Sequence, residues 1–363
     1  MALLRRGRVA VLCLFAVLGG PAAWARKPVI VEFQAPGAGT NPAQGTRGLG
    51  INDAGIITGY YTDRSIVSHG FVRDSDGSID EFDAPGAGTN TNEGTFPVSI
   101  NNAGDLAGYF VDKSGVYHGF IVTDAGISSF DAPGAGTNGP QGSFATKISS
   151  QGAVAGGYVD AANANHGLVV SPDGDLTTFD VDGAGSGKGQ GTFPIGINKK
   201  GFVSGYYVDA SGAFRGFVRS PKGKIKIFAV TGQATIARDI NDAGTIAGFS
   251  VDASLTNHGF IRTKDGTITS FDVPGASTGN STGTYAFGIN NKGLVTGEWV
   301  DANRAAHGFQ RAASGKIKKF DAAGGGTGDD QGTHPRGSAN KKGAITGYLE
   351  DDNNVSSGFL RSK

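Results

Sequence analysis

Cysteine is almost absent from this chain. Of its 363 residues only Cys13 is a cysteine, and only Trp24 and Trp299 are tryptophans. A domain without cysteine has neither disulfides nor cysteine-ligated metals, so its stability has to come from packing. Basic and acidic residues are equal in number, at 32 each, and no basic run occurs. Nucleic acid and anionic membrane surfaces are therefore poor partners for this chain.

The first 25 residues have the composition of a secretory signal peptide. A basic start, an apolar run and a small-x-small cleavage site follow one another: Arg5, Arg6 and Arg8, then Val9–Leu18, then Ala23-Trp24-Ala25. The apolar run is shorter than the roughly 20 residues that span a bilayer. We expect residues 1–25 to be removed on export, so that the protein is secreted or periplasmic and has no membrane span. A retained membrane anchor is the alternative.

One short motif recurs along the whole chain at a nearly constant spacing. It is isoleucine followed by asparagine and a turn, with one position changed in two of the copies. The copies are Ile51-Asn52, Ile100-Asn101, Ile148-Ser149, Ile197-Asn198, Ile240-Asn241, Ile289-Asn290 and Ala339-Asn340. Their spacings are 49, 48, 49, 43, 49 and 50 residues. A period of this length is typical of β units that are stacked or arranged in a ring.

Each unit contains four short segments that favour β-strands. In the second unit they are Thr95–Asn101, Asp105–Asp112, His118–Val122 and Ile127–Asp131. All four are rich in β-branched and aromatic residues, and glycine, asparagine and aspartate turns separate them. This pattern predicts an all-β fold, a seven-bladed β-propeller with four antiparallel strands per blade. A β-solenoid is the alternative, although its coils are usually shorter.

The two chain ends complement each other. The last unit stops after its third segment, Gly358–Arg361, whereas the chain after the leader begins with an extra fourth segment, Val29–Phe33. Pairing of these segments would let the N-terminal strand complete the last blade and would close the ring without free sheet edges. The repeats run without interruption, so we expect residues 26–363 to form a single domain.

The third segment of most units carries His-Gly-Phe or a close variant. Its histidines are His69, His118, His166, His258 and His307. Together with the recurring Asn-x-x-Gly and Gly-Tyr elements, these segments resemble the repeats of the HAF-family extracellular repeat proteins over nearly the whole chain after the leader. The resemblance implies secretion and a repeated β architecture, and it implies no reaction, substrate or catalytic residues. Arg215 and Ser357 depart from the pattern at the histidine.

An aspartate at the end of the second segment precedes each of these histidines by six residues. The pairs are Asp63 with His69, Asp112 with His118, Asp160 with His166, Asp252 with His258, and Asp301 with His307. Across a five-residue hairpin loop the two side chains can meet in a hydrogen bond or an ion pair. A ring of acid/base pairs or metal ligands is one interpretation. We favour a structural bond in every hairpin, since an active site seldom needs so many equivalent copies.

The connection between consecutive units is rich in oxygen donors. It reads Asp-Ala-Pro-Gly-Ala-Gly-Thr-Asn at residues 83–90 and again at 131–138. Carboxylate, amide and carbonyl oxygens suit Ca²⁺, which takes six to eight of them. An Asx-type turn that leads the chain between blades explains the same residues. Because the loops lack the spaced carboxylates of known calcium loops, we predict no metal and no cofactor, with calcium as the alternative.

Units that differ from the others are the best guide to a specific site. The connection that leads into the fifth unit, residues 228–236, is shortened. Arg215 replaces histidine in the hairpin before it, and Arg238 and Asp239 lie in the first segment after it. In a propeller the connections between blades and between second and third strands share one face. We expect these three residues to form a positively charged notch on this long-loop face. Drift within a tolerant repeat is the alternative.

Further departures occur elsewhere in the chain. Lys147 stands where other units mostly have glycine or serine, and His334 and Arg336 lie near the expected closure. Glu298-Trp299 replaces the usual Gly-Tyr, and Trp299 is a binding candidate with packing as its simpler role.

No nucleophile motif is present: the chain has no Gly-x-Ser-x-Gly elbow and no His-Glu-x-x-His. Catalytic residues therefore stay unassigned. We expect a monomeric binding scaffold for an unknown protein or extracellular polymer. A propeller hydrolase or lyase with a site on the long-loop face is one alternative, and a calcium-stabilised structural protein is another.

Overall fold

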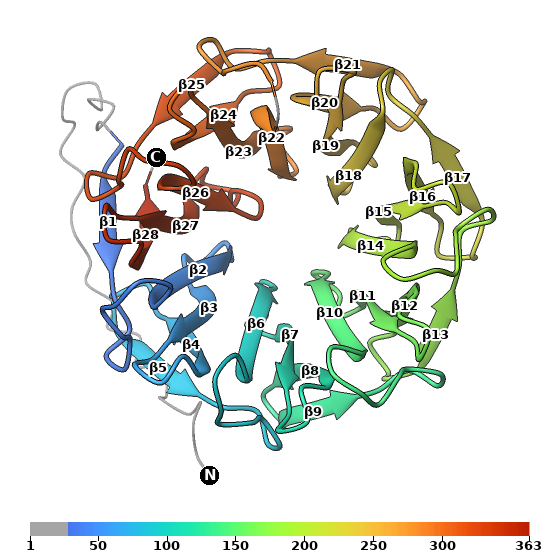
Figure 1. Cartoon of the computed structure of the whole chain (residues 1–363), viewed down its shortest axis with the longest axis horizontal. Helices are drawn as coiled ribbons and strands as arrows, with labels where there is room; N and C mark the ends of the chain where they lie inside the picture. Colours follow the sequence, from blue (N-terminus) through green and yellow to red (C-terminus); the bar gives the residue numbers. More distant parts are fainter. Residues whose placement is uncertain (1–27, 280, 363) are drawn as a thin grey trace, which may run out of the picture.

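The computed structural model describes residues 28–279 and 281–362, so the expected signal peptide, residues 1–25, lies outside the described part of the chain. The described residues form β-strands, turns and loops, with no helix among them. The strands follow one another around a closed ring (Figure 1). The centre of the ring holds a cavity and is called the central channel below. The fold is thus an all-β, propeller-like ring, as the repeat pattern predicts.

Each repeat unit contributes one strand to the wall of the channel. These first strands are β2 (Gly45–Ile51), β6 (Gly94–Ile100), β10 (Gly142–Ile148), β14 (Gly191–Ile197), β18 (Ala234–Ile240), β22 (Thr282–Ile289) and β26 (Gly332–Arg336). The second strands are β3 (Ile57–Thr62), β7 (Leu106–Val111), β11 (Val154–Val159), β15 (Val203–Val208), β19 (Ile246–Val251), β23 (Val295–Val300) and β27 (Ile345–Glu350).

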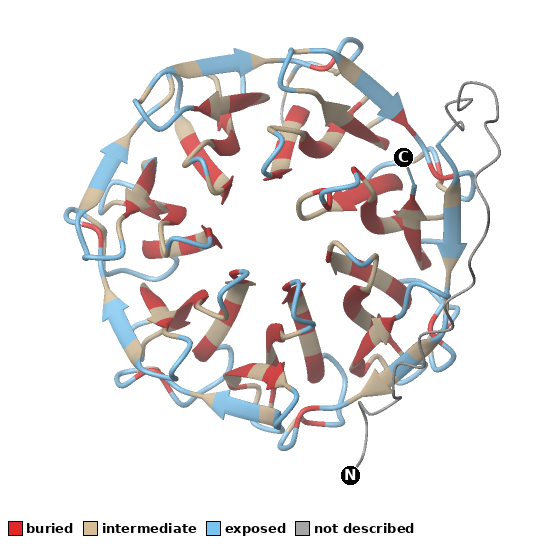
Figure 2. Cartoon of the chain, turned by 180° about the vertical axis from the view of Figure 1, so that it is seen from behind, coloured by how far each residue is buried: buried red, intermediate tan, exposed pale blue. Residues whose placement is uncertain are grey.

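Two further sets of strands lead outward. The third strands are β4 (Ser68–Arg73), β8 (Tyr117–Thr123), β12 (Asn165–Val170), β16 (Phe214–Arg219), β20 (Thr256–Arg262), β24 (Ala306–Arg311) and β28 (Ser356–Arg361). The outermost strands are β5 (Ile79–Phe82), β9 (Gly126–Phe130), β13 (Leu176–Phe179), β17 (Ile225–Phe228), β21 (Ile268–Phe271), β25 (Ile317–Phe320) and β1 (Ile30–Phe33). Figure 2 shows that burial falls from the inner strands to these exposed outer ones.

Strands that are consecutive in a unit pair antiparallel, as in β2–β3–β4–β5 and β6–β7–β8–β9. The expected pairing of the chain ends is present, because β1 pairs antiparallel with β28 and Glu32 lies opposite Phe359. A short parallel contact also joins each third strand to the next first strand, so all 28 described strands belong to one continuous sheet. At one such contact Gly94 has φ 116°, and a Cβ there would lie 1.9 Å from the Ser68 carbonyl oxygen. Only glycine allows this approach.

The hydrophobic core lies between neighbouring units. Phe71, Phe120 and Phe359, on third strands, are fully buried. Each meets, edge to face, a phenylalanine at the end of the preceding unit's outermost strand, as in Phe82 against Phe120 with ring centroids 6.4 Å apart. Phe33 of β1 contacts Phe71 in the same way at 5.9 Å. Because each such side chain stabilises the fold by about 1.5–3 kcal/mol when buried, the packing that joins the units continues across the chain ends.

Candidate functional site

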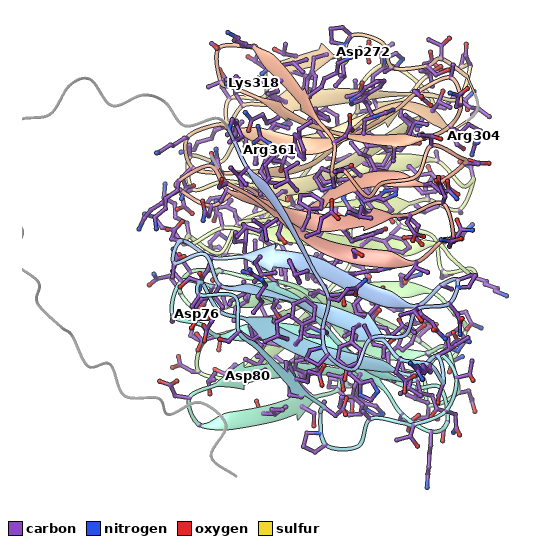
Figure 3. The ribbon with its side chains drawn as sticks, turned by 90° about the vertical axis from the view of Figure 1, so that its left-hand side faces the viewer. Asp76, Asp80, Asp272, Arg304, Lys318 and Arg361 are labelled. Carbon is purple, nitrogen blue, oxygen red and sulfur yellow. The ribbon has the colours of Figure 1, made fainter. Side chains whose placement is uncertain are left out.

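A cavity of about 480 Å³ occupies the central channel. Its wall is formed by the C-terminal halves of the first strands, and its mouth by the turns that follow them, such as residues 52–53 and 101–102. These turns lie on the face opposite the long connections. The ring seen edge-on places Asp76, in the turn between β4 and β5, and Arg304, between β23 and β24, at opposite faces (Figure 3). The expectation of a site on the long-loop face is therefore wrong for this cavity.

The mouth of the cavity is held by a belt of asparagine side chains from the recurring Ile-Asn motif. Each Oδ1 accepts from its own turn, as Asn52 Oδ1 does from the backbone nitrogens of Ala54, Gly55 and Ile56 at 3.0–3.1 Å. Each Nδ2 donates to the next unit's backbone. The donors and acceptors are Asn52 to Asn101 O, Asn101 to Ser149 O, Asn198 to Asn241 O, Asn241 to Asn290 O, Asn290 to Asn340 O, and Asn340 to Asn52 O. The belt therefore ties neighbouring units around the channel.

In six of the seven first strands a β-bulge turns one side chain into the cavity, while β26 places Arg336 there without a shift in its pairing register. In β6, for example, the pairing register shifts between Pro97 and Ser99, which leaves Val98 facing the channel. The equivalent side chains differ between the two sides of the ring. Leu49, Val98, Thr146 and Ile195 form what we call the uncharged half, and Arg238, Phe287 and Arg336 form the cationic half. Bulges are a common means of redirecting a side chain at a functional site.

Three side chains from non-adjacent units meet across the channel. Lys147 Nζ of β10 lies 3.0 Å from Asp239 Oδ1 of β18 and 3.2 Å from Ser338 Oγ, which follows β26. Ser338 Oγ donates to Asp239 Oδ2, and that oxygen also accepts from the backbone nitrogen of Ile289 at 3.1 Å. Asp239 is almost fully buried. Its charge is thus compensated within this network.

Arg336 of the cationic half is also compensated. Its Nη1 donates to Glu298 Oε2 at 3.2 Å and its Nη2 to the Tyr348 hydroxyl at 3.0 Å, while His334 Nδ1 lies 3.0 Å from the same Glu298 oxygen. Burial alone would raise the pKa of Glu298, but the Arg336 charge and the His334 contact outweigh it and the net direction is downward. Burial likewise opposes the charged form of Arg336, yet Glu298 and Tyr348 raise its pKa overall.

Arg238 differs from its neighbour because its guanidinium makes no hydrogen bond or ion pair among the described residues, and its Nε is buried and unsatisfied. Other arginines with a buried free Nε, such as Arg73 and Arg219, still donate from Nη1 to a backbone carbonyl. The Arg238 guanidinium lies 5.4 Å from the centroid of Phe287, over the ring that Arg336 approaches at 4.9 Å. Burial, with the charge of Arg336 added, lowers the pKa of Arg238. An arginine stays protonated nonetheless.

The charged residues that line the cavity are predominantly basic. Within the described chain the cations are Lys147, Lys199, Arg238, Lys292, Arg336 and Lys341, and the anions are Asp53, Asp239 and Asp242. The chain as a whole has no net charge. The excess of positive charge is therefore a local property of the channel, and it favours an anionic group there.

The five predicted Asp and His pairs lie outside this cavity, at the outer hairpins. Each histidine contacts the expected aspartate: His166 Nε2 is 3.3 Å from Asp160 Oδ2, and the other pairs are within 3.3–3.7 Å. The sequence did not reveal that Nδ1 contacts a second aspartate, such as Asp180 at 2.9 Å. The second aspartates are Asp83, Asp131, Asp180, Asp272 and Asp321, the first residues of the connections between units.

This second contact also bears on the calcium alternative. In five connections the first residue is an aspartate that contacts histidine. The hairpin aspartates accept backbone hydrogen bonds, as Asp63 Oδ1 does from Ser65 and Val67. Across residues 28–279 and 281–362 no group of three or more His, Cys, Asp or Glu side chains is arranged to hold a metal ion.

The structure does not bring Arg215 together with Arg238 and Asp239. Arg215 contacts Asp209 at 3.5 Å on the outer hairpin and is exposed, so the predicted notch is not formed. Trp299 is also away from the channel lining. It is buried, stacks on His307 with centroids 4.3 Å apart, and lies under Lys319 Nζ at 4.4 Å. Packing accounts for its position.

The sequence predicted part of the lining of this cavity. Arg238, Asp239, Arg336 and Lys147 stood out as departures from the repeat, and all four line the cavity. Phe287 and Ser338 were missed. The signal for Phe287 was its place two residues before the Ile-Asn motif, where the equivalent side chains face the channel.

No protein-family model and no curated protein matches this sequence, so the resemblance to the HAF family stays a prediction. Several solved structures share the fold. The BP39L lectin from Burkholderia pseudomallei aligns with a TM-score of 0.53 and 10% identity over 87% of this chain and 95% of that chain. The β-propeller domain of the Trilobed protease from Pyrococcus furiosus aligns with a TM-score of 0.51 and 9% identity, over 86% of this chain and 93% of that chain.

TolB from Acinetobacter baumannii aligns with a TM-score of 0.47 and 11% identity. The alignment covers 78% of this chain and 64% of the TolB chain. Identities this low show the propeller fold and nothing of the function. In the part of the chain that the structure describes, no helix is both long and apolar enough to cross a membrane.

Proposed function

We propose that this chain is an exported, monomeric seven-bladed β-propeller, with four strands per blade, that acts as a binding scaffold. The antiparallel order of the strands within each unit and the pairing of β1 with β28 support this blade count. The partner is an extracellular protein or surface polymer that inserts one of its groups into the central cavity. The periplasm or the medium is the proposed location.

The observation that carries this function is the convergence of unlike residues in one cavity. Lys147, Arg238 and Arg336 come from three different units, at positions where most other units place small or aliphatic residues. A repeated scaffold needs equivalent residues at equivalent positions, so side chains that differ and still meet are a mark of a binding site.

Blocking the cavity tests this proposal. Val98→Trp fills the uncharged half, whereas Val31→Trp makes the same change on the exposed outer strand β1. The chain, immobilised and exposed to cell-surface polymer and secreted protein, is expected to retain a specific partner. Retention should persist in Val31→Trp and be lost in Val98→Trp. Equal retention by Val98→Trp would place the binding surface elsewhere.

A propeller hydrolase is the second candidate, because Ser338 Oγ lies 3.2 Å from Lys147 Nζ inside the cavity. Ser338 Oγ donates its hydrogen bond to Asp239 Oδ2 and not to Lys147 Nζ, so Lys147 is not placed to take up the serine proton as a base. Hydrolysis of p-nitrophenyl acetate tests this candidate. A rate that is the same in Ser338→Ala as in the wild type would exclude Ser338 as the nucleophile.

A further inference from the structure

We infer that the cavity recognises an organic carboxylate with an apolar body, with Arg238 as the residue that binds the carboxylate. This inference rests on the proposed binding function and specifies the chemistry of the inserted group. It comes from two properties of the same cavity: one guanidinium without a hydrogen bond, and the division of the wall into an uncharged half and a cationic half.

The first property is the state of Arg238. Every other charge close to it is already matched: Arg336 by Glu298, and Lys147 by Asp239. Among the described residues the Arg238 guanidinium makes no hydrogen bond or ion pair, and its Nε is buried. The nearby carboxylates of Asp239 and Glu298 attract its charge, but each is bonded to another cation. Burial of an unpaired cation costs free energy, so a fold retains one where a ligand supplies the counter-charge. The planar guanidinium fork matches a carboxylate through two parallel hydrogen bonds.

The second property is the wall that faces Arg238. β2, β6, β10 and β14 follow one another around the ring and carry the uncharged half, Leu49, Val98, Thr146 and Ile195, while the neighbouring β18, β22 and β26 carry the cationic half (Figure 1). A ligand with its anion at Arg238 therefore directs the rest of its body toward aliphatic side chains. Phe287, beside the guanidinium, adds an aromatic surface on the cationic side.

These two properties favour a carboxylate over a phosphate group. Inorganic phosphate needs several donors converging on one point, and the donors that Arg336 and Lys147 direct to Glu298, Asp239 and Ser338 are not free for it. A phosphate would also leave the aliphatic side of the cavity in contact with water alone. A carboxylate on a hydrocarbon or aromatic body uses both sides.

Calorimetric titration of the purified chain with 3-phenylpropionate at low salt tests the inference. The neutral amide 3-phenylpropanamide and inorganic phosphate are the comparison probes. We expect 3-phenylpropionate to bind, the amide to bind about ten-fold or more weakly because it lacks the charge-assisted bond, and phosphate to give no measurable heat. Equal affinity for acid and amide, or binding of phosphate without the acid, would overturn the inference.

Two arginine variants localise the carboxylate. Arg238→Gln should weaken 3-phenylpropionate about ten-fold or more, whereas Arg215→Gln, the same change on the outer hairpin, should leave the affinity unchanged. The free Arg238→Gln protein should melt at a higher temperature than the wild type, because it lacks a partly buried guanidinium that makes no hydrogen bond or ion pair among the described residues. Unchanged affinity in Arg238→Gln, or a lower melting temperature in it, would contradict the role given to Arg238.

The two proposals fail separately. If Val98→Trp loses the extracellular partner while 3-phenylpropionate does not bind, the scaffold function stands and the carboxylate chemistry is wrong. If 3-phenylpropionate binds through Arg238 while Val98→Trp still retains the partner, the cavity binds a small carboxylate and the partner binds another surface.

Discussion

Asn340 donates its side-chain amide to the backbone carbonyl of Asn52 at 3.0 Å, although 288 positions separate them in the chain. The bond joins the last unit to the first at the mouth of the channel. The equivalent bond between Asn52 and Asn101 joins the first unit to the second at 3.2 Å. The closure of the ring is thus made by the same interaction that joins neighbouring units.

Removal of this side chain should destabilise the protein. In Asn340→Ala the acceptor of the turn nitrogens of Lys342 and Ala344 is lost together with the bond to Asn52. Unsatisfied buried groups cost about 1–3 kcal/mol, so we expect the free energy of unfolding in urea to fall by about that amount. Asn353→Ala, at an exposed turn, is the matched control and should be neutral. If the two variants unfold with the same free energy, the belt does not stabilise the fold.

The asparagine belt is interrupted at one position, where Ser149 stands in place of asparagine. Ser149 accepts from the backbone nitrogens of Gln151 and Ala153, but in the described structure its side chain makes no bond to the next unit. Ser149→Asn restores the residue used by the other units and should add one inter-unit hydrogen bond. The expected gain in unfolding free energy is about 1 kcal/mol, measured by urea denaturation. A loss of stability would mean that the third unit is spaced differently at this turn.

Stability should fall as the pH rises above neutrality. The hydrogen bond from His69 Nδ1 to the Asp83 carboxylate raises the pKa of His69. Burial alone would lower the pKa of His166 and of His258, but their two aspartates outweigh it and the net direction is upward. A histidine whose pKa is higher in the folded state stabilises the fold fully below its unfolded pKa of about 6.5, and this contribution is lost as the pH passes its folded pKa.

Melting curves between pH 6 and pH 9 measure this effect. The melting temperature should decline across this range in the wild type. The triple variant His69→Gln, His166→Gln, His258→Gln lacks the titrating groups and should show a flatter profile. A parallel decline in both proteins would assign the pH dependence to other groups.

Chelation should have no effect on stability. Asp83 and its equivalents contact histidine, and the hairpin aspartates accept backbone hydrogen bonds, so a bound Ca²⁺ would have to displace these contacts. Scanning calorimetry with EDTA and then with added Ca²⁺ should give one melting temperature. A rise on adding Ca²⁺ would favour the calcium-stabilised alternative instead.

The fold could be predicted because the interactions that build it recur from unit to unit and leave a repeated pattern in the sequence. The Ile-Asn motif marks a turn whose asparagine bonds both to its own turn and to the next unit, and a residue with two such roles recurs in most units. The glycine of His-Gly-Phe also recurs because a contact present in most units requires it. A Cβ at Gly119 would lie 2.2 Å from the Phe130 ring of the neighbouring outer strand. Interactions of this kind repeat, and repetition is visible in one sequence.

The site was accessible only in part, because its residues do not repeat. Arg238 and Lys147 were visible as exceptions, but nothing in the sequence says that Lys147 and Asp239, 92 positions apart, lie 3.0 Å from each other. The same limit explains the wrong grouping of Arg215 with Arg238. They are close along the chain, and antiparallel pairing nevertheless places one at the outer hairpin and the other in the channel.

The sequence alone determined the repeated unit, the four strands within it and the complementary ends, because turn preference and strand pairing act over short stretches of chain. Only the tertiary structure decided which departures from the repeat meet. Ring closure brings first strands from every unit to one axis, and in six of them a bulge turns one side chain toward it. That convergence depends on distances around the ring, which no local pattern encodes.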